Sequence, residues 1–177
     1  PRLFEKFPDI RVACEHVTTK VAVDFITSAP DTVAGSITPQ HLIYTIGDLL
    51  QGLKYHLYCL PLLKFDEDRA ALRAAVTNPD NTKFYAGTDS APHTKKTTPC
   101  GCAAGCYTGG IAPQLYAESF EFAGCDLSIS DNQDIFRHFL CINGPKFYNL
   151  KPSDKQFTLH KTPSSIQSLE TKDGNIV

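Results

Sequence analysis

The sequence predicts an α/β fold in which helices pack on a parallel β-sheet. Short apolar runs alternate along the 177 residues with segments of helical periodicity. Strands and helices that alternate in this way form βα units, whose strands run parallel. Hydrophobic residues make up 42% of the chain and charged residues 20%, as in soluble globular domains. A disordered or fibrous chain is therefore excluded.

The first part of the chain contains two predicted strands with a helix between them. The run 10–14 is short and contains β-branched residues, which is typical of a buried strand. Thr18 or Thr19 is a suitable N-cap for the helix that follows. Apolar residues keep helical spacing from there until Pro30, and the run 33–37 predicts the second strand.

The rest of the chain continues the alternation. Residues 55–60 form a third apolar run, which predicts a strand stopped by the proline that follows. Acidic residues in a first turn and apolar residues four apart predict a helix over 66–76. The run 84–86 predicts a fourth strand, and helical patterns follow over 112–122 and 132–140.

Charge and cysteine content exclude several classes of protein. Lys and Arg number 17 against 19 Asp and Glu, so the basic surface of a dedicated nucleic-acid binder is absent. No apolar run approaches the ~20 residues of a membrane helix. The seven cysteines cannot all pair within one chain, which favours a reducing compartment. We therefore expect a cytoplasmic protein without a nucleic-acid or membrane partner.

The limits of the chain are unusual. It contains no methionine and begins at Pro1, so we expect a processed chain, a fragment or an incompletely read sequence. No repeat or linker divides it, and residues 1–177 are therefore expected to form a single domain. Within it, about 151–177 is expected to be a polar C-terminal segment.

Three polar residues follow predicted strands directly. His16, His41 and Asp89 each lie just after the carboxyl end of an apolar run. This end of a parallel sheet is where α/β proteins bind ligands. Imidazole and carboxylate groups are ligands that suit Zn²⁺. The pattern predicts a metal site, and it leaves open the alternative that each residue is an isolated polar group at a strand end.

Longer strings of sequence point to a known family. Over roughly residues 7–150, six strings in this order closely resemble the dihydroorotases of the amidohydrolase superfamily, of the compact bacterial and plant type. The strings are EHVTT at 15–19, ITPQHL at 37–42, HLYCLP at 56–61, GTDSAPH at 87–93, CGCA at 100–103 and NGPKFY at 143–148.

The resemblance implies a fold and a metal centre. The chain would be the C-terminal half of a (β/α)₈ TIM-type barrel, about strands 5–8 and their helices, with a two-zinc site at its C-terminal face. His16 and His41 would bind one zinc ion. Asp89 would bind the other and act as the catalytic general base and acid.

The resemblance also implies the substrate contacts. Leu60 would contact the substrate ring through its backbone, and His93 and Ala103 would hold the substrate carboxylate. The family bridges its two Zn²⁺ ions with a carboxylated lysine and adds a His-x-His pair. Neither can be placed in this sequence. Activity is therefore expected only together with the missing N-terminal half of the barrel.

The implied activity is the reversible cyclisation of N-carbamoyl-L-aspartate to L-dihydroorotate in de novo pyrimidine biosynthesis. The family resemblance further implies a small-molecule substrate and a homodimer. Two alternatives remain open at this point. One is a non-catalytic, dihydroorotase-like scaffold or partner-binding fragment, which the missing ligands favour. The other is a hydantoinase-like cyclic amidohydrolase of the same superfamily.

Overall fold

The computed structural model describes residues 2–99, 101–163, 165–166 and 168–172. Pro1, Cys100 and residues 173–177, on which parts of the sequence analysis rest, lie outside the described residues. Among the helices that the structure describes, none has the length and apolar character needed to cross a membrane.

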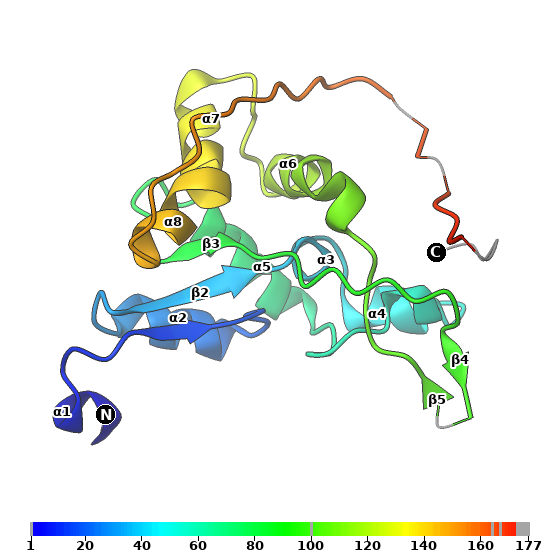
Figure 1. Cartoon of the computed structure of the whole chain (residues 1–177), viewed down its shortest axis with the longest axis horizontal. Coiled ribbons are helices and arrows are strands. Elements are labelled where there is room, and N and C mark those ends of the chain that lie inside the picture. The colour runs from blue at the N-terminus through cyan, green and yellow to red at the C-terminus, as the bar shows by residue number, and fades with distance from the viewer. Residues whose placement is uncertain (1, 100, 164, 167, 173–177) are drawn as a thin grey trace.

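A three-stranded parallel sheet lies at the centre of the structure (Figure 1). β2 (Val33–Ile37) lies between β1 (Val12–Cys14) and β3 (Phe84–Ala86) and runs parallel to both. Gly35, in the middle of β2, pairs with a residue of each neighbour. Because the pairing is parallel, the carboxyl ends of all three strands lie at the same edge of the sheet.

Helices connect the strands. α2 (Lys20–Ser28) lies between β1 and β2 in the chain, and α5 (Asp66–Val76) precedes β3. The hydroxyl of Thr19 accepts a hydrogen bond of 3.2 Å from the backbone N–H of Ala22, so Thr19 is the N-cap of α2. The remaining elements are α1 (Arg2–Lys6), α3 (Pro39–Ile43), α4 (Ile46–Leu50), the 3₁₀ helix η1 (Tyr55–Leu57), β4 (Thr97–Thr98), β5 (Gly101–Cys102), the 3₁₀ helix η2 (Gly109–Ile111), α6 (Ala112–Phe122), α7 (Ser130–Arg137), the π-helix η3 (His138–Ile142) and α8 (Asn143–Phe147).

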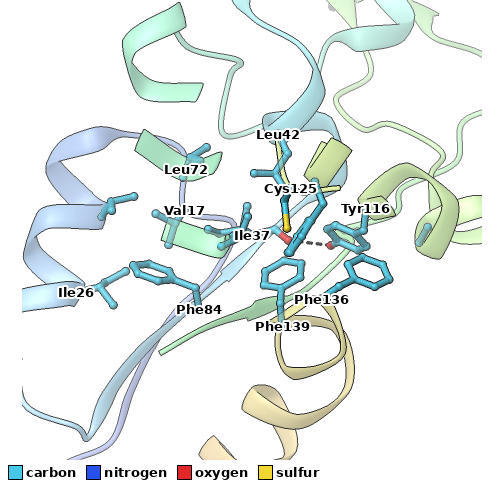
Figure 2. Packing of buried hydrophobic residues seen from close by; sticks show 14 of the residues in the cluster. Val17, Ile26, Ile37, Leu42, Leu72, Phe84, Tyr116, Cys125, Phe136 and Phe139 are labelled. Carbon is cyan, nitrogen blue, oxygen red and sulfur yellow. Dashed lines mark hydrogen bonds between the residues drawn. The ribbon is translucent and has the colours of Figure 1, made fainter. Parts of the chain in front are cut away.

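One face of the sheet carries the main hydrophobic core (Figure 2). Ile37 and Phe84 project from the strands into a cluster with buried residues of α2, α5 and α6. Phe139 of η3 is fully buried there, and its ring meets the ring of Tyr116 edge-on, with centroids 5.3 Å apart. The Tyr116 hydroxyl donates a hydrogen bond of 2.8 Å to the carbonyl of Ile37, which satisfies the polar end of this buried side chain.

The opposite face of the sheet carries a smaller cluster. Successive strand residues point to opposite faces, so Ala34 and Tyr85 lie on the side away from the main core. Both pack against Phe147 of α8, and the guanidinium of Arg11 lies 4.7 Å from the centre of the Phe147 ring. α8 therefore covers part of this second face.

The predicted fold class is present, but two elements differ from the sequence-based expectation. Residues 55–60 do not form a strand; they contain η1 and then irregular backbone. The carbonyl of Tyr58 accepts hydrogen bonds from Lys96 and Gly105 of a later loop, and not from a sheet neighbour. The helix expected over 132–140 begins at Ser130 and changes to a π-helix at His138.

Replacement of Phe139 by alanine tests the main core. The fully buried ring would leave a cavity, so we expect the free energy of unfolding to fall by about 3–5 kcal/mol. Phe157→Ala is the matched control, because this ring is 58% exposed, and it should change stability by less than about 0.5 kcal/mol. Urea denaturation of the protein as its gene encodes it measures both. Equal effects of the two changes would contradict this packing.

Candidate active site

Two residues beyond the carboxyl ends of the strands have a left-handed backbone. His16 follows β1 with φ of +40°, and Asp89 follows β3 with φ of +43°. Such a conformation costs a non-glycine residue on the order of 1–3 kcal/mol, and it is concentrated at functional sites. The surrounding contacts must therefore hold each of these turns in place.

The turn at His16 is held through its backbone. The N–H of His16 donates a hydrogen bond of 2.9 Å to Ser36 Oγ, and the next N–H, of Val17, donates to the Ser36 carbonyl at 2.8 Å. The imidazole is half-buried, and its Nδ1 atom has no hydrogen-bond partner among the described residues. The main chain is thus satisfied while one ring nitrogen is left for another partner.

The segment after Asp89 is held by a second serine. Ser90 Oγ accepts hydrogen bonds from the backbone N–H groups of Thr108, at 3.1 Å, and Gly109, at 2.8 Å. These two residues lie at the start of η2, just before α6. The Asp89 side chain itself is exposed, so its carboxylate is open to solvent or ligand.

His41 lies in α3, just after β2, and is 3% exposed. Its Nε2 atom is 2.8 Å from the carbonyl oxygen of Pro61, and its Nδ1 atom is 2.6 Å from Thr38 Oγ1. Because a carbonyl oxygen can only accept, Nε2 carries the proton and Nδ1 accepts from the threonine hydroxyl. Burial lowers the pKa of His41 to about 4, although the Pro61 carbonyl opposes this shift. The ring is therefore neutral at neutral pH.

His93 and Ala103 lie on one loop system after β3. The Nε2 atom of exposed His93 is 2.8 Å from the carbonyl of Ala104, which fixes the ring against the later part of the loop. The N–H of Ala103 donates a hydrogen bond of 2.7 Å to the Lys96 carbonyl. Because Ala104 directly follows Ala103, the contact of His93 with Ala104 brings the two residues predicted to hold the substrate carboxylate close together.

Leu60 belongs to a neighbouring loop. The Lys96 side chain connects this loop to the loop that carries His93 and Ala103. The Lys96 ammonium donates hydrogen bonds to the carbonyls of Tyr58, at 3.0 Å, and Gly105, at 2.7 Å. Leu60 is 59% exposed beside this junction. A cavity of about 330 Å³ borders the two loops, and Lys96 contributes to its lining.

Two buried thiols lie beneath these loops. Cys59 Sγ is 3.9 Å from His41 Nε2, and Cys106 Sγ donates to the carbonyl of His56 at 3.4 Å. The hydrogen bond with Cys106, followed by burial, raises the pKa of Cys59. Cys59 therefore stays protonated at neutral pH and packs as a small side chain.

The structure places His16, His41 and Asp89 beyond the ends of β1, β2 and β3. Within the described ranges, however, no three His, Cys, Asp or Glu side chains are arranged to hold a metal ion. His41 uses both ring nitrogens in hydrogen bonds, whereas His16 has one that is unpaired. The candidate residues thus share one edge of the sheet without forming a closed set of ligands.

Sequence reasoning missed the residues that support this edge. Ser36 and Ser90 hold the two strained turns, and Lys96 joins the two loops, although a lysine in this loop has the sequence pattern of a solvated residue. Their positions inside or beside the family-like strings were the available signal. Their hydrogen bonds are between residues distant in the chain, so periodicity and composition carry no trace of them.

Comparison with known proteins gives a consistent result. No family model matches the chain. It is 45% identical over 179 residues to a dihydroorotase of Nitrosococcus oceani, covering 99% of this chain and 49% of that protein. It is 44% identical over 167 residues to a dihydroorotase of Picosynechococcus, covering 93% of this chain and 46% of that protein. The resemblance to dihydroorotases is confirmed.

Solved dihydroorotase structures share the fold. The dihydroorotase of Campylobacter jejuni superimposes with a TM-score of 0.81 at 30% identity, over 99% of this chain and 50% of that one. A dihydroorotase of Saccharomyces cerevisiae in complex with 5-fluoroorotic acid gives a TM-score of 0.72 at 28% identity, over 85% of this chain and 41% of that one. The predicted fold class, half of a TIM-type barrel, is confirmed. The chain spans about half the length of the curated dihydroorotases that it matches.

Two glycine substitutions test the packing within the loop region after β3. A Cβ on Gly105 would lie 2.6 Å from the carbonyl oxygen of Ala91, whereas a Cβ on Gly101 would meet nothing within 4 Å. Both glycines have positive φ, so the two alanine variants differ mainly in the clash. We expect Gly105→Ala to be less stable than Gly101→Ala by about 1–3 kcal/mol in urea denaturation. Equal stability would show that Gly105 is not packed against Ala91 as described.

Proposed function

We propose that the protein carrying this chain is a zinc-dependent dihydroorotase that interconverts N-carbamoyl-L-aspartate and L-dihydroorotate in pyrimidine biosynthesis. The supporting observation is that His16 and Asp89 are held on strained turns at one edge of the sheet, in a chain 45% identical to a dihydroorotase. Strain of this kind needs compensating contacts, and both turns have them.

The chemistry of the donor set fits zinc, which takes imidazole nitrogen and carboxylate oxygen. His16 offers a buried, unpaired Nδ1 atom, His41 a neutral ring, and Asp89 an exposed carboxylate. To bind zinc through Nε2, His41 would give up its hydrogen bond to the Pro61 carbonyl and take the tautomer with its proton on Nδ1. Nδ1 would then donate to Thr38 Oγ1, which would orient the ring as outer-shell partners do.

We propose that His16 and His41 bind one zinc ion and Asp89 the other, with a carboxylated lysine from outside this sequence bridging the two. When bound, zinc would lower the pKa of water and polarise the scissile amide. Asp89 would take the proton of the attacking water and return it to the leaving ring nitrogen. His93 and Ala103 would hold the substrate carboxylate, and the Leu60 backbone would contact the ring.

The same proposal extends to the location, oligomeric state and partners of the protein. We propose a cytoplasmic homodimer that acts on a small molecule, with neither a nucleic acid nor a membrane as partner. The near balance of 17 basic and 19 acidic residues supports the lack of a nucleic-acid partner. We also propose that residues 1–177 belong to a single barrel domain with a polar C-terminal segment.

A second candidate function is a non-catalytic scaffold with the same fold. One observation favours it: no three potential ligands among the described residues are arranged to hold a metal. Such a scaffold would bind no zinc and would not hydrolyse dihydroorotate. The strained turns at His16 and Asp89 favour the enzyme, because strained backbone is concentrated at functional sites.

Replacement of Asp89 by alanine tests the enzyme proposal. Loss of the proton-transfer group should lower kcat for dihydroorotate by about 10²–10⁴-fold. Asp80→Ala is the matched control, since Asp80 is an exposed carboxylate that precedes the amino end of β3, whereas Asp89 follows its carboxyl end. The assay uses the protein as its gene encodes it and follows ring opening by absorbance. An Asp89→Ala variant as active as the control would exclude the proposed role.

A further inference from the structure

A chain of hydrogen bonds connects the end of α8 to the backbone of His16. The hydroxyl of Tyr148, the C-cap residue of α8, donates to Glu15 Oε1 at 3.0 Å. The other carboxylate oxygen, Oε2, accepts a close hydrogen bond from Ser36 Oγ. Ser36 Oγ in turn accepts the hydrogen bond of 2.9 Å from the N–H of His16.

The donors in this chain have one consistent assignment. An ionised carboxylate only accepts, so both Tyr148 and Ser36 give their hydroxyl protons to Glu15. The 2.9 Å contact between the hydroxyls of Tyr148 and Tyr85 is then donated by Tyr85. The oxygen of Ser36 remains able to accept from His16. Removal of the Ser36 hydroxyl therefore takes away the acceptor of the His16 N–H, and removal of the Tyr148 hydroxyl takes away one of the two donors that fix the Glu15 carboxylate.

Ser36, in the middle of this chain of hydrogen bonds, is confined by packing. Ser36 is 2% exposed on β2, and a Cβ added to Gly87 would lie only 2.6 Å from the Ser36 Cβ atom. Gly87 itself is held by a backbone hydrogen bond of 3.2 Å to Ile37. The backbone at Gly87 therefore packs directly against Ser36 and restricts where its hydroxyl can point.

Tyr148, at the far end of this chain of hydrogen bonds, is anchored by α8. Asn143 Nδ2 donates to the carbonyls of Asn81, at 3.0 Å, and Phe84, at 3.1 Å, so the start of α8 is tied to β3. At its other end, the ring of Tyr148 packs edge-on against Tyr85, with centroids 5.8 Å apart. These contacts give the 143–148 string a structural role, although it contributes no residue to the candidate active site.

We propose that Glu15 and Ser36 are positioning residues for His16, and that Tyr148 completes their hydrogen-bond chain from α8. Together they hold the N–H of His16 and so maintain the strained turn that presents its imidazole. Without them the turn can relax, and the imidazole is no longer held toward a metal. This inference rests on the proposed function for the role of His16 as a zinc ligand.

Three variants and a control test the inference: Tyr148→Phe, Ser36→Ala, the double variant, and Tyr55→Phe. Tyr148→Phe removes one oxygen atom and keeps the ring. Tyr55→Phe is matched to it, because Tyr55 is 49% exposed and its ring contact with His56 survives the change. Apparent zinc affinity is measured by chelator competition on the protein as its gene encodes it. The kcat and KM for dihydroorotate and the melting temperature are measured on the same samples.

We expect zinc affinity to fall about tenfold in Tyr148→Phe and about 100-fold in Ser36→Ala, the range found for partners of metal ligands. kcat should fall with KM unchanged. Because Tyr148 acts through Glu15 and Ser36, the double variant should lose no more than Ser36→Ala alone. Tyr55→Phe should match the wild type. A purely structural role would instead lower the melting temperature and leave zinc affinity unchanged, which would overturn the inference.

The two proposals fail in different ways. A wild-type protein that binds zinc but does not open dihydroorotate overturns the proposed function, and the zinc affinities then decide the positioning inference. An active wild type whose Tyr148→Phe variant equals Tyr55→Phe in zinc affinity and kcat overturns the positioning inference alone. A wild type that binds no zinc overturns both.

Discussion

The parallel pairing of β2 with β1 and β3 is the constraint on which the rest of the structure depends. All five residues of β2 are buried, because the main core covers one face and neighbouring side chains cover the other. The pairing brings the carboxyl ends of three strands to one edge, although those strands are separated by long stretches of sequence. His16, His41 and Asp89 then lie beyond the same edge without any local motif.

Holding these residues in place requires a second layer of contacts. A serine hydroxyl supports each strained turn. Ser36 Oγ accepts a hydrogen bond from the N–H of His16, and Ser90 Oγ accepts hydrogen bonds from two N–H groups at the start of η2. Each serine makes its bonds across the fold, so an element distant in the chain stabilises each turn. The free energy of strain at the turns is offset by packing and hydrogen bonding elsewhere, as is common at functional sites.

The sequence predicted the regular elements better than the irregular ones. The strand at 33–37 and the helices at 66–76 and 112–122 have their expected bounds, because apolar periodicity and end signals agree there. Residues 55–60 are as apolar as a strand, but their backbone bonds to the loop around Gly105, which no local pattern reveals.

The candidate site was predictable in its residue types and not in its geometry. His16, His41 and Asp89 were identified by their positions just after apolar runs and then by the family-like strings that contain them. Thr38 lies only three positions before His41, whereas the bond of His41 Nε2 to the carbonyl of Pro61, 20 positions away, depends on tertiary structure. The same is true of the chain from Tyr148 to His16, which joins residues more than 100 positions apart.

The central claim is that this edge of the sheet is a zinc site, and a crystal structure with anomalous diffraction at the zinc absorption edge tests it most directly. The crystal should hold the protein as its gene encodes it, grown with zinc. The account predicts one anomalous peak about 2.0–2.1 Å from a ring nitrogen of both His16 and His41, and a second peak at similar distance from the Asp89 carboxylate. A well-ordered crystal with no peak beside these residues would contradict it.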